Sequence, residues 1–517
     1  MNIEIVGSTS TRKLGISMSI IGIDIGTSAI KIAAFQENGG LLLVVRMPVN
    51  AAYPSPGMEE MNPDETWQAV LSGLTKVANS AELKGDPPVA LAISASGDEV
   101  FLVDQRGNPL TPCILSGDVR GGEVEAIALQ KDSIEGWYTS CGHIPERMDP
   151  VNRLVWWQSN RPDLFSQTHY YLGWHEFIAY RLCGRAVIDP SLASKWLTFD
   201  LSTRGWLSDR CSLFDLNPSC MPQIQDWGQP IGEIRSDIAA QTGLPPKTLI
   251  CVGAFDSTSA ALGSGVSDAG IAGLACGSWQ VVVAPTAGLS FTNSLLESGF
   301  PITPYPGMVS QAFLAQSPNG TAILDWLAQL VNMSVSEIEI HLSGTESGPG
   351  SILSIPHFSG AISSWKNGRD SRGAFLGVTL ATSRQDMLKA LMESGVFDLH
   401  LTLKQLERTG ALVHVLRASG GGSRSAWWMQ LIADLTGIPV QVAAQTEPGA
   451  FGAALLAGTS IGLFPSISEA AKSLVSVKQT FEPNPKRQQL YADRMELYQE
   501  VVGQFLSLHR KLTNGKK

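Results

Sequence analysis

The stretch "SIIGIDIGTSAIKIAAF", residues 19 to 35, carries one acidic residue out of an apolar run, turns on small residues and returns into a second apolar run. The first run predicts a strand buried on both faces, and the second predicts its antiparallel partner. Thr27 and Ser28 are small, so the turn could present N–H groups and hydroxyls to an anion, with Asp24 beside them to hold a cation. The alternative is an ordinary hairpin in which Asp24 bonds its own turn.

Length and composition predict a folded protein of two large domains. The 517 residues exceed what one hydrophobic core normally supports, and 44% are hydrophobic while 16% are charged. The net charge of −10 argues against nucleic acid and anionic membranes as partners. The net charge does not exclude a small phosphorylated ligand.

Seven scattered cysteines, odd in number and without a C-x-x-C pair, are typical of a reducing compartment, so we expect a cytoplasmic protein. No apolar run reaches about 18 residues, so no membrane span is predicted. Residues 1–18 lack the apolar core of a signal peptide and are predicted to form a loose extension.

The first part of the chain predicts a mixed sheet covered by helices. Three strands are expected over 19–47, a helix over 62–82 and a buried strand over 89–96. Residues 100–115 predict a hairpin that turns at 106–108. This alternation of strands and helices is typical of an α/β domain.

Further along, amphipathic helices are predicted over 151–165, over 173–184 with a stop at Gly184, and over 492–512 near the C-terminus. A buried strand over 248–256 precedes "GIAGLACGSWQVVVAPT" at 270–286, which repeats the opening strand, turn and strand. We therefore expect a duplicated pair of domains that face one cleft.

The motif "GAFDSTSAALGSG", residues 253–265, places Asp256 where a buried strand ends and a helix of small residues begins. A carboxylate there could accept a proton from a bound hydroxyl, while the helix N-terminus attracts phosphate. The alternative is that Asp256 only caps the helix.

Two glycine-rich segments lie in the second half. Gly420, Gly421 and Gly422 precede a helix, and a backbone without side chains lets a ligand approach closely, although such a run also serves as a flexible helix entry. The segment 447–458, "EPGAFGAALLAG", is also consistent with close helix packing alone.

Three other sites are excluded by their patterns. There is no G-x-x-x-x-G-K-[ST], and "WHEFIAY" has Ala179 where H-E-x-x-H needs its second histidine. No His, Cys and carboxylate spacing indicates zinc.

Taken in order, "GIDIGTSAIK", "GAFDSTSAALGSG", "ACGSWQVVVAPT", "SRGAFLGVTL" and "ASGGGSRSAWWMQLIADLTGIPV…EPGAFGAALLAG" resemble the FGGY carbohydrate kinases from about residue 19 to 475. The resemblance implies an α/β actin-like ATPase fold of two ribonuclease-H-like domains, with ATP and a sugar in the cleft between them. It places the N-terminal domain at 19–266 and the C-terminal domain at 267–517.

The resemblance also assigns roles to residues. Asp24 matches the aspartate of the first phosphate motif near Mg²⁺, and Asp256 matches the catalytic base, which also faces the metal and the substrate. The segment 447–452 lies where the nucleotide pocket closes. ATP contacts are implied for Gly26, Thr27, Ser28, Lys31, Gly277, Ser278, Gly420, Gly421, Gly422, Ser425 and Gln430. Substrate contacts are implied for Ser96, Gly97, Asp98, Asp118, Arg120, His175 and Glu176.

The implied reaction is direct in-line transfer of the γ-phosphoryl group from ATP to a sugar hydroxyl that Asp256 deprotonates. Two departures from the family bear on the acceptor: Ser116 replaces a tryptophan, and residues 356–375 lack an "E-R-T-P" sequence of xylulokinases. The motifs are nearest to the branch of xylulose, L-xylulose, 3-keto-gulonate and erythritol kinases, which implies a small ketose or polyol.

Two other functions share parts of this pattern. A sugar sensor would keep the fold without transfer, although both Asp24 and Asp256 are present. An ATPase of the actin or chaperone type would share the hairpin but would leave "SGDVRG", residues 116–121, unexplained. For His175, a buried structural histidine is the alternative to a substrate contact. A homodimer is left open.

Overall fold

The computed structural model describes residues 18–288, 291–307, 311–343, 348–361 and 371–514. The chain forms two compact units. The first contains the residues up to Ser267 together with Pro301–Gln311 and Glu447–Val475, and the second contains Asp268–Phe300, Ala312–Thr446 and the residues from Ser476 onward. Each unit is described by itself.

The first unit has a central mixed sheet and several two-stranded pairs. Its strands are β1 (Ser19–Ile25), β2 (Ala29–Gln36), β3 (Leu41–Pro48), β4 (Glu60–Met61), β5 (Pro88–Ala95), β6 (Phe101–Val103), β7 (Cys113–Ile114), β8 (Tyr170–Leu172), β9 (Val187–Ile188), β10 (Phe199–Asp200), β11 (Gly205–Trp206), β12 (Gln223–Ile224), β13 (Pro230–Glu233), β14 (Leu249–Phe255) and β17 (Ile302–Pro304). Its helices are α1 (Pro63–Ala78), α2 (Val124–Lys131), α3 (Ile134–Cys141), α4 (Pro150–Asn160), α5 (Pro162–Phe165), α6 (Trp174–Cys183), α7 (Pro190–Ala193), α8 (Ser208–Leu213), α9 (Ser236–Thr242), α10 (Asp256–Gly263), α16 (Pro448–Ser460) and α17 (Ile467–Leu474).

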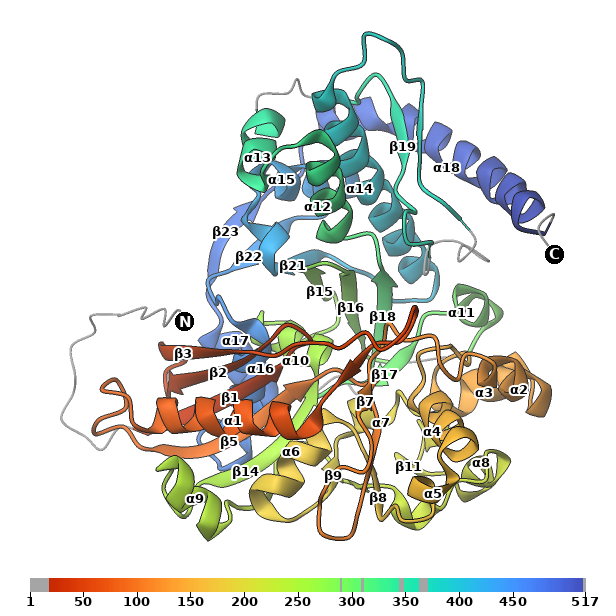
Figure 1. Cartoon of the computed structure of the whole chain (residues 1–517). Coiled ribbons are helices and arrows are strands. Elements are labelled where there is room, and N and C mark those ends of the chain that lie inside the picture. The colour runs from red at the N-terminus through yellow and green to blue at the C-terminus, as the bar shows by residue number, and fades with distance from the viewer. Residues whose placement is uncertain (1–17, 289–290, 308–310, 344–347, 362–370, 515–517) are drawn as a thin grey trace. The chain divides into compact units, whose positions relative to one another are not determined.

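The central sheet of this unit has the strand order β13-β14-β5-β1-β2-β3. Strand β2 is antiparallel to both of its neighbours, β1 and β3, whereas β5 and β14 run parallel to β1 (Figure 1). Because neighbouring residues of a strand point to opposite faces, Ile21, Ile23 and Ile25 join one core with α1 and α6. The alternate residues of β1 therefore face the other side of the sheet.

Helix α16 covers that other side at very short range. A Cβ added to Gly22 of β1 would lie 1.7 Å from the carbonyl oxygen of Ala450. The contact of α16 with α10 is equally tight, because a Cβ on Gly452 would lie 1.9 Å from the oxygen of Ser259. The glycines and alanines of this segment thus serve close packing, as the alternative interpretation of 447–458 proposed.

The second unit is built on a sheet whose strands β18, β16, β15, β21, β22 and β23 follow one another in that order. Its strands are β15 (Ile271–Cys276), β16 (Gln280–Thr286), β18 (Gln311–Ser317, which begins with the last residue of the first unit), β19 (Leu353–Ile355), β20 (Ala374–Leu376), β21 (Val415–Ser419), β22 (Val440–Ala443) and β23 (Val477–Phe481). Its helices are α11 (Asn293–Ser298), α12 (Thr321–Val331), α13 (Val335–Ser343), α14 (Arg384–Arg408), α15 (Ala426–Thr436) and α18 (Pro485–Asn514).

The two sheets have the same connection order. Five strands of each sheet are arranged 3-2-1-4-5 when they are numbered by their place in the chain: β1, β2, β3, β5 and β14 in the first, and β15, β16, β18, β21 and β22 in the second. An antiparallel edge strand lies beside the fifth in both sheets, but β13 precedes β14 in the chain, whereas β23 follows β22. In both sheets the first two strands form a hairpin, and the fourth runs parallel to the first. The duplication predicted from the two strand–turn–strand stretches is confirmed at the level of topology.

Two predicted elements differ in detail. The helix expected over 151–165 is broken into α4 and α5, because Pro162 cannot donate the backbone hydrogen bond that would continue the helix. Residues 106–108 do turn, with Gly107 at φ +83°, but the strand pairing differs from a simple hairpin. The main partner of β6 is β8, and that of β7 is β4.

The assignment of 447–475 to the first unit differs from the predicted boundary at 266/267, because α16 packs on β1, β5 and β14 rather than on the second sheet. The loose extension predicted over residues 1–18 lies outside the described ranges except for Met18. Residues 362–370 of the segment 356–375 also lie outside them. Among the described helices, none is long and apolar enough to cross a membrane.

Candidate active site

Asp24 lies near the end of β1 and is held from a neighbouring strand. The register of β1 and β5 places Asp24 opposite Ser94, whose hydroxyl donates a 2.9 Å hydrogen bond to Asp24 Oδ1. Asp24 Oδ2 lies 3.5 Å from Lys31 Nζ on β2. The carboxylate therefore bonds across the sheet, and within the described part of the chain it makes no hydrogen bond to its own turn.

Lys31 links Asp24 to a second carboxylate. Its Nζ also lies 3.5 Å from Glu447 Oε2, and Glu447 is paired with Arg46 of β3. Glu447 is almost fully buried, directly before Pro448 at the start of α16. Two cations and two carboxylates thus alternate along one edge of the first unit, so Lys31 is positioned by both acidic groups.

The turn between β1 and β2 is tight and open to solvent. Gly26 N–H donates to the carbonyl of Ala29 at 3.2 Å, which closes the turn. Thr27 and Ser28 are exposed, so their N–H groups and hydroxyls are accessible to a ligand. This geometry is compatible with the predicted anion contact.

Asp256 stands at the junction of β14 and α10. It is the first residue of the helix, and the N-cap residue is Phe255, which makes no side-chain capping bond. The Asp256 carboxylate accepts from the Ser257 N–H and hydroxyl. Burial, with the nearby charges of Asp24 and Asp98, raises its pKa to about 7. A carboxyl group with this pKa can exchange a proton near neutral pH, which a cap does not require.

The turn after β5 places more polar groups near Asp256. Ser96 donates its hydroxyl to Glu99 Oε2, and Asp98 Oδ1 lies 3.1 Å from Lys195 Nζ. Burial, with the charges of Asp98 and Asp256, raises the pKa of Glu99 to about 8, so its carboxyl group is protonated at neutral pH. The predicted residues Ser96, Gly97 and Asp98 are therefore close enough to Asp256 to share its electrostatic environment.

Asp118 and Arg120 pair with each other. Arg120 binds both oxygens of Asp118, reaches Glu60 at 2.6 Å and stacks over Trp156 with 4.9 Å between its Cζ and the ring centroid. Both members of the pair are nearly fully buried. Their partners are thus supplied within the protein, and their predicted contact with substrate stays a prediction.

His175 and Glu176 are buried in the body of the first unit. His175 Nε2 accepts the Gly253 N–H at 3.1 Å, and burial lowers the pKa of His175 to about 4. Glu176 Oε2 accepts the Gly173 N–H at the start of α6. The structure gives both side chains a structural role, which corresponds to the alternative considered for His175, and their substrate contact stays a prediction.

In the second unit, the turn after β15 is closely packed by glycine. The Gly277 carbonyl accepts the Thr321 N–H at 2.8 Å. A Cβ added to Gly320, which precedes α12, would lie 2.4 Å from Gly277 O and 2.6 Å from Ser278 O. Ser278 itself is exposed. The turn therefore packs against Gly320 on one side, and Ser278 is accessible to solvent on the other.

The glycine run 420–422 lies beside this turn, because β15 and β21 are parallel neighbours with Ala275 opposite Ser419. Gly420 has φ +85°, and a Cβ there would lie 2.9 Å from Cys276 O. Gly421 is exposed with no atom within 4 Å of its added Cβ. The run is thus a shaped loop with one open glycine, more than a flexible helix entry.

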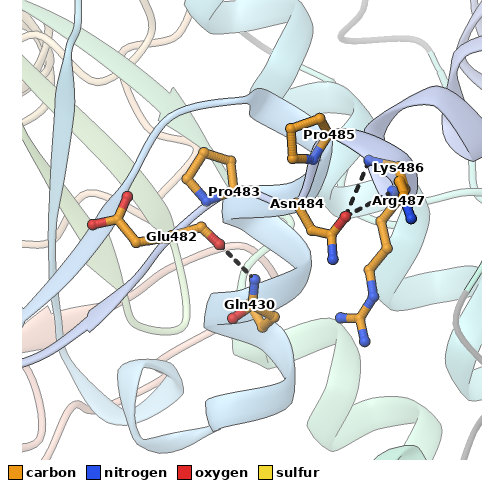
Figure 2. A pocket seen from close by; sticks show the side chains of 7 residues that line it. All are labelled: Gln430, Glu482, Pro483, Asn484, Pro485, Lys486 and Arg487. Carbon is orange, nitrogen blue, oxygen red and sulfur yellow. Dashed lines mark hydrogen bonds between the residues drawn. The ribbon is translucent and has the colours of Figure 1, made fainter.

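Ser425 and Gln430 have protein partners. Ser425 Oγ accepts the Trp428 N–H at 3.1 Å and caps α15. Gln430 Nε2 donates to Glu482 O and to Asp434 Oδ1. Figure 2 shows Gln430 at an open pocket lined also by 482–487, where Asn484 Oδ1 accepts two backbone N–H groups. Both amide donors of Gln430 are occupied, and its contact with nucleotide stays a prediction.

Comparison with known families matches residues 19–263 to the FGGY family of carbohydrate kinases, N-terminal domain, and residues 276–461 to the C-terminal domain of the same family. The chain belongs to the FGGY carbohydrate kinases. Its two units have the α/β actin-like ATPase fold of this family. The resemblance seen in the motifs is confirmed, and the protein is a carbohydrate kinase, a phosphotransferase.

Full-length relatives support the family assignment. The chain is 28% identical over 499 residues to L-xylulose/3-keto-L-gulonate kinase of Escherichia coli, covering 95% of this chain and 98% of that one. It is 25% identical over 491 residues to xylulose kinase of Staphylococcus epidermidis, covering 94% and 96%. The crystal structure of ligand-bound xylulose kinase from Lactobacillus acidophilus has a TM-score of 0.88 at 21% identity, covering 96% of this chain and all of that one.

The carboxylates of this kinase fit a nucleotide-bound magnesium ion. Among the described residues no group of three or more His, Cys, Asp or Glu side chains could hold a metal. Magnesium carried by substrate phosphates needs only one or two protein carboxylates, and it keeps several waters. Asp24 is partly exposed, and its charge acts on Asp256, so the two carboxylates are near each other in the first unit.

Sequence reasoning missed several residues of this site in the kinase. Ser94 lies opposite Asp24 because β1 pairs with β5. The sequences of these two strands do not indicate that they pair, so the contact could not be predicted. The segment 447–452 was predicted to lie where the nucleotide pocket closes, but the pairing of Glu447 with Arg46, 401 positions away, was not predicted. Lys195 follows the short helix α7, and no motif marks it. For these residues only the tertiary structure carries the signal.

Proposed function

We propose that this kinase transfers the γ-phosphoryl group of ATP to a hydroxyl of a small, xylulose-like ketose or polyol, with Asp256 as the general base. The observation that carries the proposal is the partly buried carboxylate of Asp256, which directly follows β14 and has a pKa of about 7. A base with this pKa is partly deprotonated at neutral pH and can take the proton of an attacking hydroxyl.

Asp24 and Asp256 are the residues that would hold Mg²⁺ in the first unit. When bound, the ion neutralises charge on the phosphates of the nucleotide. Lys31, fixed between Asp24 and Glu447, would contact phosphate oxygens from the edge of the β1–β2 hairpin. The exposed turn at Gly26, Thr27 and Ser28 would add N–H and hydroxyl donors to the same anion.

In the second unit, the paired loops at 277–278 and 420–422 support nucleotide binding. Gly421 is open to solvent, and Gly420 and Gly320 bring backbone close to the loops without side chains between them. Backbone N–H groups in such loops bind phosphate without added bulk. We include Ser425 and Gln430 in this assignment on the resemblance alone, because their side chains already have protein partners.

The acceptor is proposed from the relatives and from the turn at 96–99. The named activities of the two curated relatives concern xylulose, L-xylulose and 3-keto-L-gulonate. Near Asp256, Asp98, Lys195 and the protonated Glu99 offer both donors and acceptors, as an acceptor with several hydroxyls requires. Ser116 stands where the family has a tryptophan, so the acceptor can differ from D-xylulose.

A panel of sugars tests this function. Purified protein with ATP and Mg²⁺ is offered pentuloses, hexuloses, tetritols, pentitols and sugar acids, and ADP release is followed together with the phosphorylated product by mass spectrometry. We expect acceptor-dependent ADP release with at least one ketose or polyol, and loss of turnover in Asp256→Asn with ATP binding retained. Acceptor binding without turnover in the wild type would instead identify a silent sugar sensor, and near wild-type turnover by Asp256→Asn would refute the base assignment.

A further inference from the structure

Lys195 brings a cation to the residues around the proposed base. Its side chain passes across the turn after β5, where a Cβ added to Gly97 would lie 2.8 Å from Lys195 Cγ. The ammonium lies 3.1 Å from Asp98 Oδ1 and 5.3 Å from the ring centroid of Phe255, the residue before Asp256. A glycine at position 97 therefore makes room for a lysine that reaches the neighbourhood of the base.

The ammonium of Lys195 has hydrogen-bonding capacity to spare. It carries three donors, and Asp98 lies within ion-pair distance, while the charges of Glu146 and Asp149 act on it from farther away. The other nearby buried cation, Arg153, donates instead to the backbone carbonyls of Arg120 and Arg147. The Arg153 Nε has no partner among the described residues either, but Arg153 is fully buried, whereas the Lys195 side chain keeps 14% of its exposure, so Lys195 is the cation of this region that a ligand can reach.

The same region contains an acceptor without a partner. Glu99 is 2% exposed, its Oε2 accepts from Ser96, and its Oε1 has no hydrogen-bond partner among the described residues. Buried polar atoms are nearly always paired in folded proteins, so an unpaired atom beside spare donors indicates a place for a polar ligand. A hydroxyl group can both donate and accept, which matches such a mixed set.

We propose that Lys195 and Asp98 act together as the selector for the acceptor, favouring a neutral polyhydroxy compound over a sugar acid. This inference rests on the proposed kinase function and deepens it. Paired with Asp98, Lys195 donates to hydroxyl oxygens but offers no uncompensated positive charge. A carboxylate on the acceptor would meet Asp98 and Asp256, while neighbouring carboxylates already offset the charge of Lys195, which selects against it.

The test uses the full-length enzyme with ATP and Mg²⁺, xylulose as the neutral probe and gluconate as the acidic probe. Lys195→Met is expected to lower kcat/KM for xylulose by roughly ten- to a hundredfold, mostly through KM, because it removes charged hydrogen bonds to the acceptor. Asp98→Asn removes the carboxylate that lies nearest to the Lys195 ammonium, so the positive charge of Lys195 is less compensated. The ratio of kcat/KM for gluconate to that for xylulose should therefore rise by about tenfold or more. The control is Lys247→Met, which changes an exposed lysine of the same unit.

Two further outcomes keep the test decisive. If Lys195→Met fails to fold because Asp98 is left unpaired, the double variant Asp98→Asn/Lys195→Met removes both charges; it should lose xylulose activity without gaining gluconate activity. An unchanged gluconate-to-xylulose ratio in Asp98→Asn, or an unchanged KM for xylulose in the lysine variants, would overturn the selector. Absence of acceptor phosphorylation by the wild-type protein across the whole sugar panel would instead refute the kinase function proposed above.

Discussion

The carboxylate of Asp24 lies directly against the backbone of Gly449. A Cβ added to Gly449 would come within 2.9 Å of both Asp24 Cγ and Oδ1 and 3.0 Å of Oδ2. Helix α16 therefore touches the proposed phosphate and magnesium residue at its second position, where only a hydrogen atom fits. The position of the Asp24 carboxylate therefore depends on how α16 packs against β1.

We predict that Gly449→Ala lowers kcat/KM by roughly ten- to a hundredfold and raises the Mg²⁺ concentration needed for half-maximal rate, because the methyl group must displace either the carboxylate or the helix. Steady-state kinetics over a magnesium series measures both effects. Gly503→Ala is the matched control, since Gly503 lies in α18 with open space around it. Equal kinetics for the two alanine variants would show that Asp24 needs no exact placement by α16.

Asp256 is expected to destabilise the free protein at alkaline pH. Its folded pKa of about 7 is above the ordinary 3.8, so the folded state binds more protons than the unfolded state between these values. Stability attributable to this group therefore falls as pH rises from about 4 to 7, and the cost is complete above 7. Asp256→Asn should be more stable than wild type at pH 8, by on the order of 2–4 kcal/mol, with a smaller gap at pH 5.

Urea unfolding of metal-free protein at both pH values checks this prediction, with Asp209→Asn at an exposed site as the control. The same pKa predicts that kcat/KM of the wild type rises with pH across the region near 7, before any alkaline limb. A stability gap that is the same at pH 5 and pH 8 would contradict the raised pKa.

His175 should act on stability. Its folded pKa of about 4 lies below the ordinary 6.5, so its contribution is complete above 6.5 and is lost as pH falls from there towards 4. His175→Leu leaves the buried Gly253 N–H without an acceptor and should cost about 1–3 kcal/mol at pH 7. Unfolding at pH 7 and pH 5 should show that wild type loses its advantage over the variant in acid. A variant of normal stability with a large increase in acceptor KM would restore the substrate-contact interpretation.

Two neighbouring glycines of the second unit separate fold from nucleotide binding. Gly421→Val should leave Tm unchanged, because its added side chain meets open space, and should raise the KM for ATP by about tenfold if nucleotide lies on this loop. Gly420→Ala should lower Tm, because φ +85° and the contact with Cys276 O both disfavour a side chain. Differential scanning fluorimetry and ATP titrations distinguish the two, and an unchanged ATP KM in Gly421→Val would remove the loop from the nucleotide site.

The strand–turn–strand design and the strand-end position of Asp256 were predictable, because hydrophobic alternation and small-residue turns are local signals. The sheet order was not predictable, and it places β5, with Ser94, between β1, which carries Asp24, and β14, which directly precedes Asp256. The partners of His175 and Gln430 were also invisible, since a side chain's hydrogen bonds depend on elements distant in sequence. Motifs thus predict where the site lies, whereas tertiary contacts decide which of its residues are free to meet a ligand.

The position of α16 in the sequence, far after the strands that it covers, has a consequence for biosynthesis. Strands β1, β5 and β14 all leave the ribosome before Ser267, but the helix that covers the Gly22 face of their sheet begins at Pro448. The nascent chain must carry this bare apolar surface while most of the second unit is translated, and we expect it to be prone to aggregation during that time. A fragment ended at Ser267 would keep that surface permanently and should aggregate.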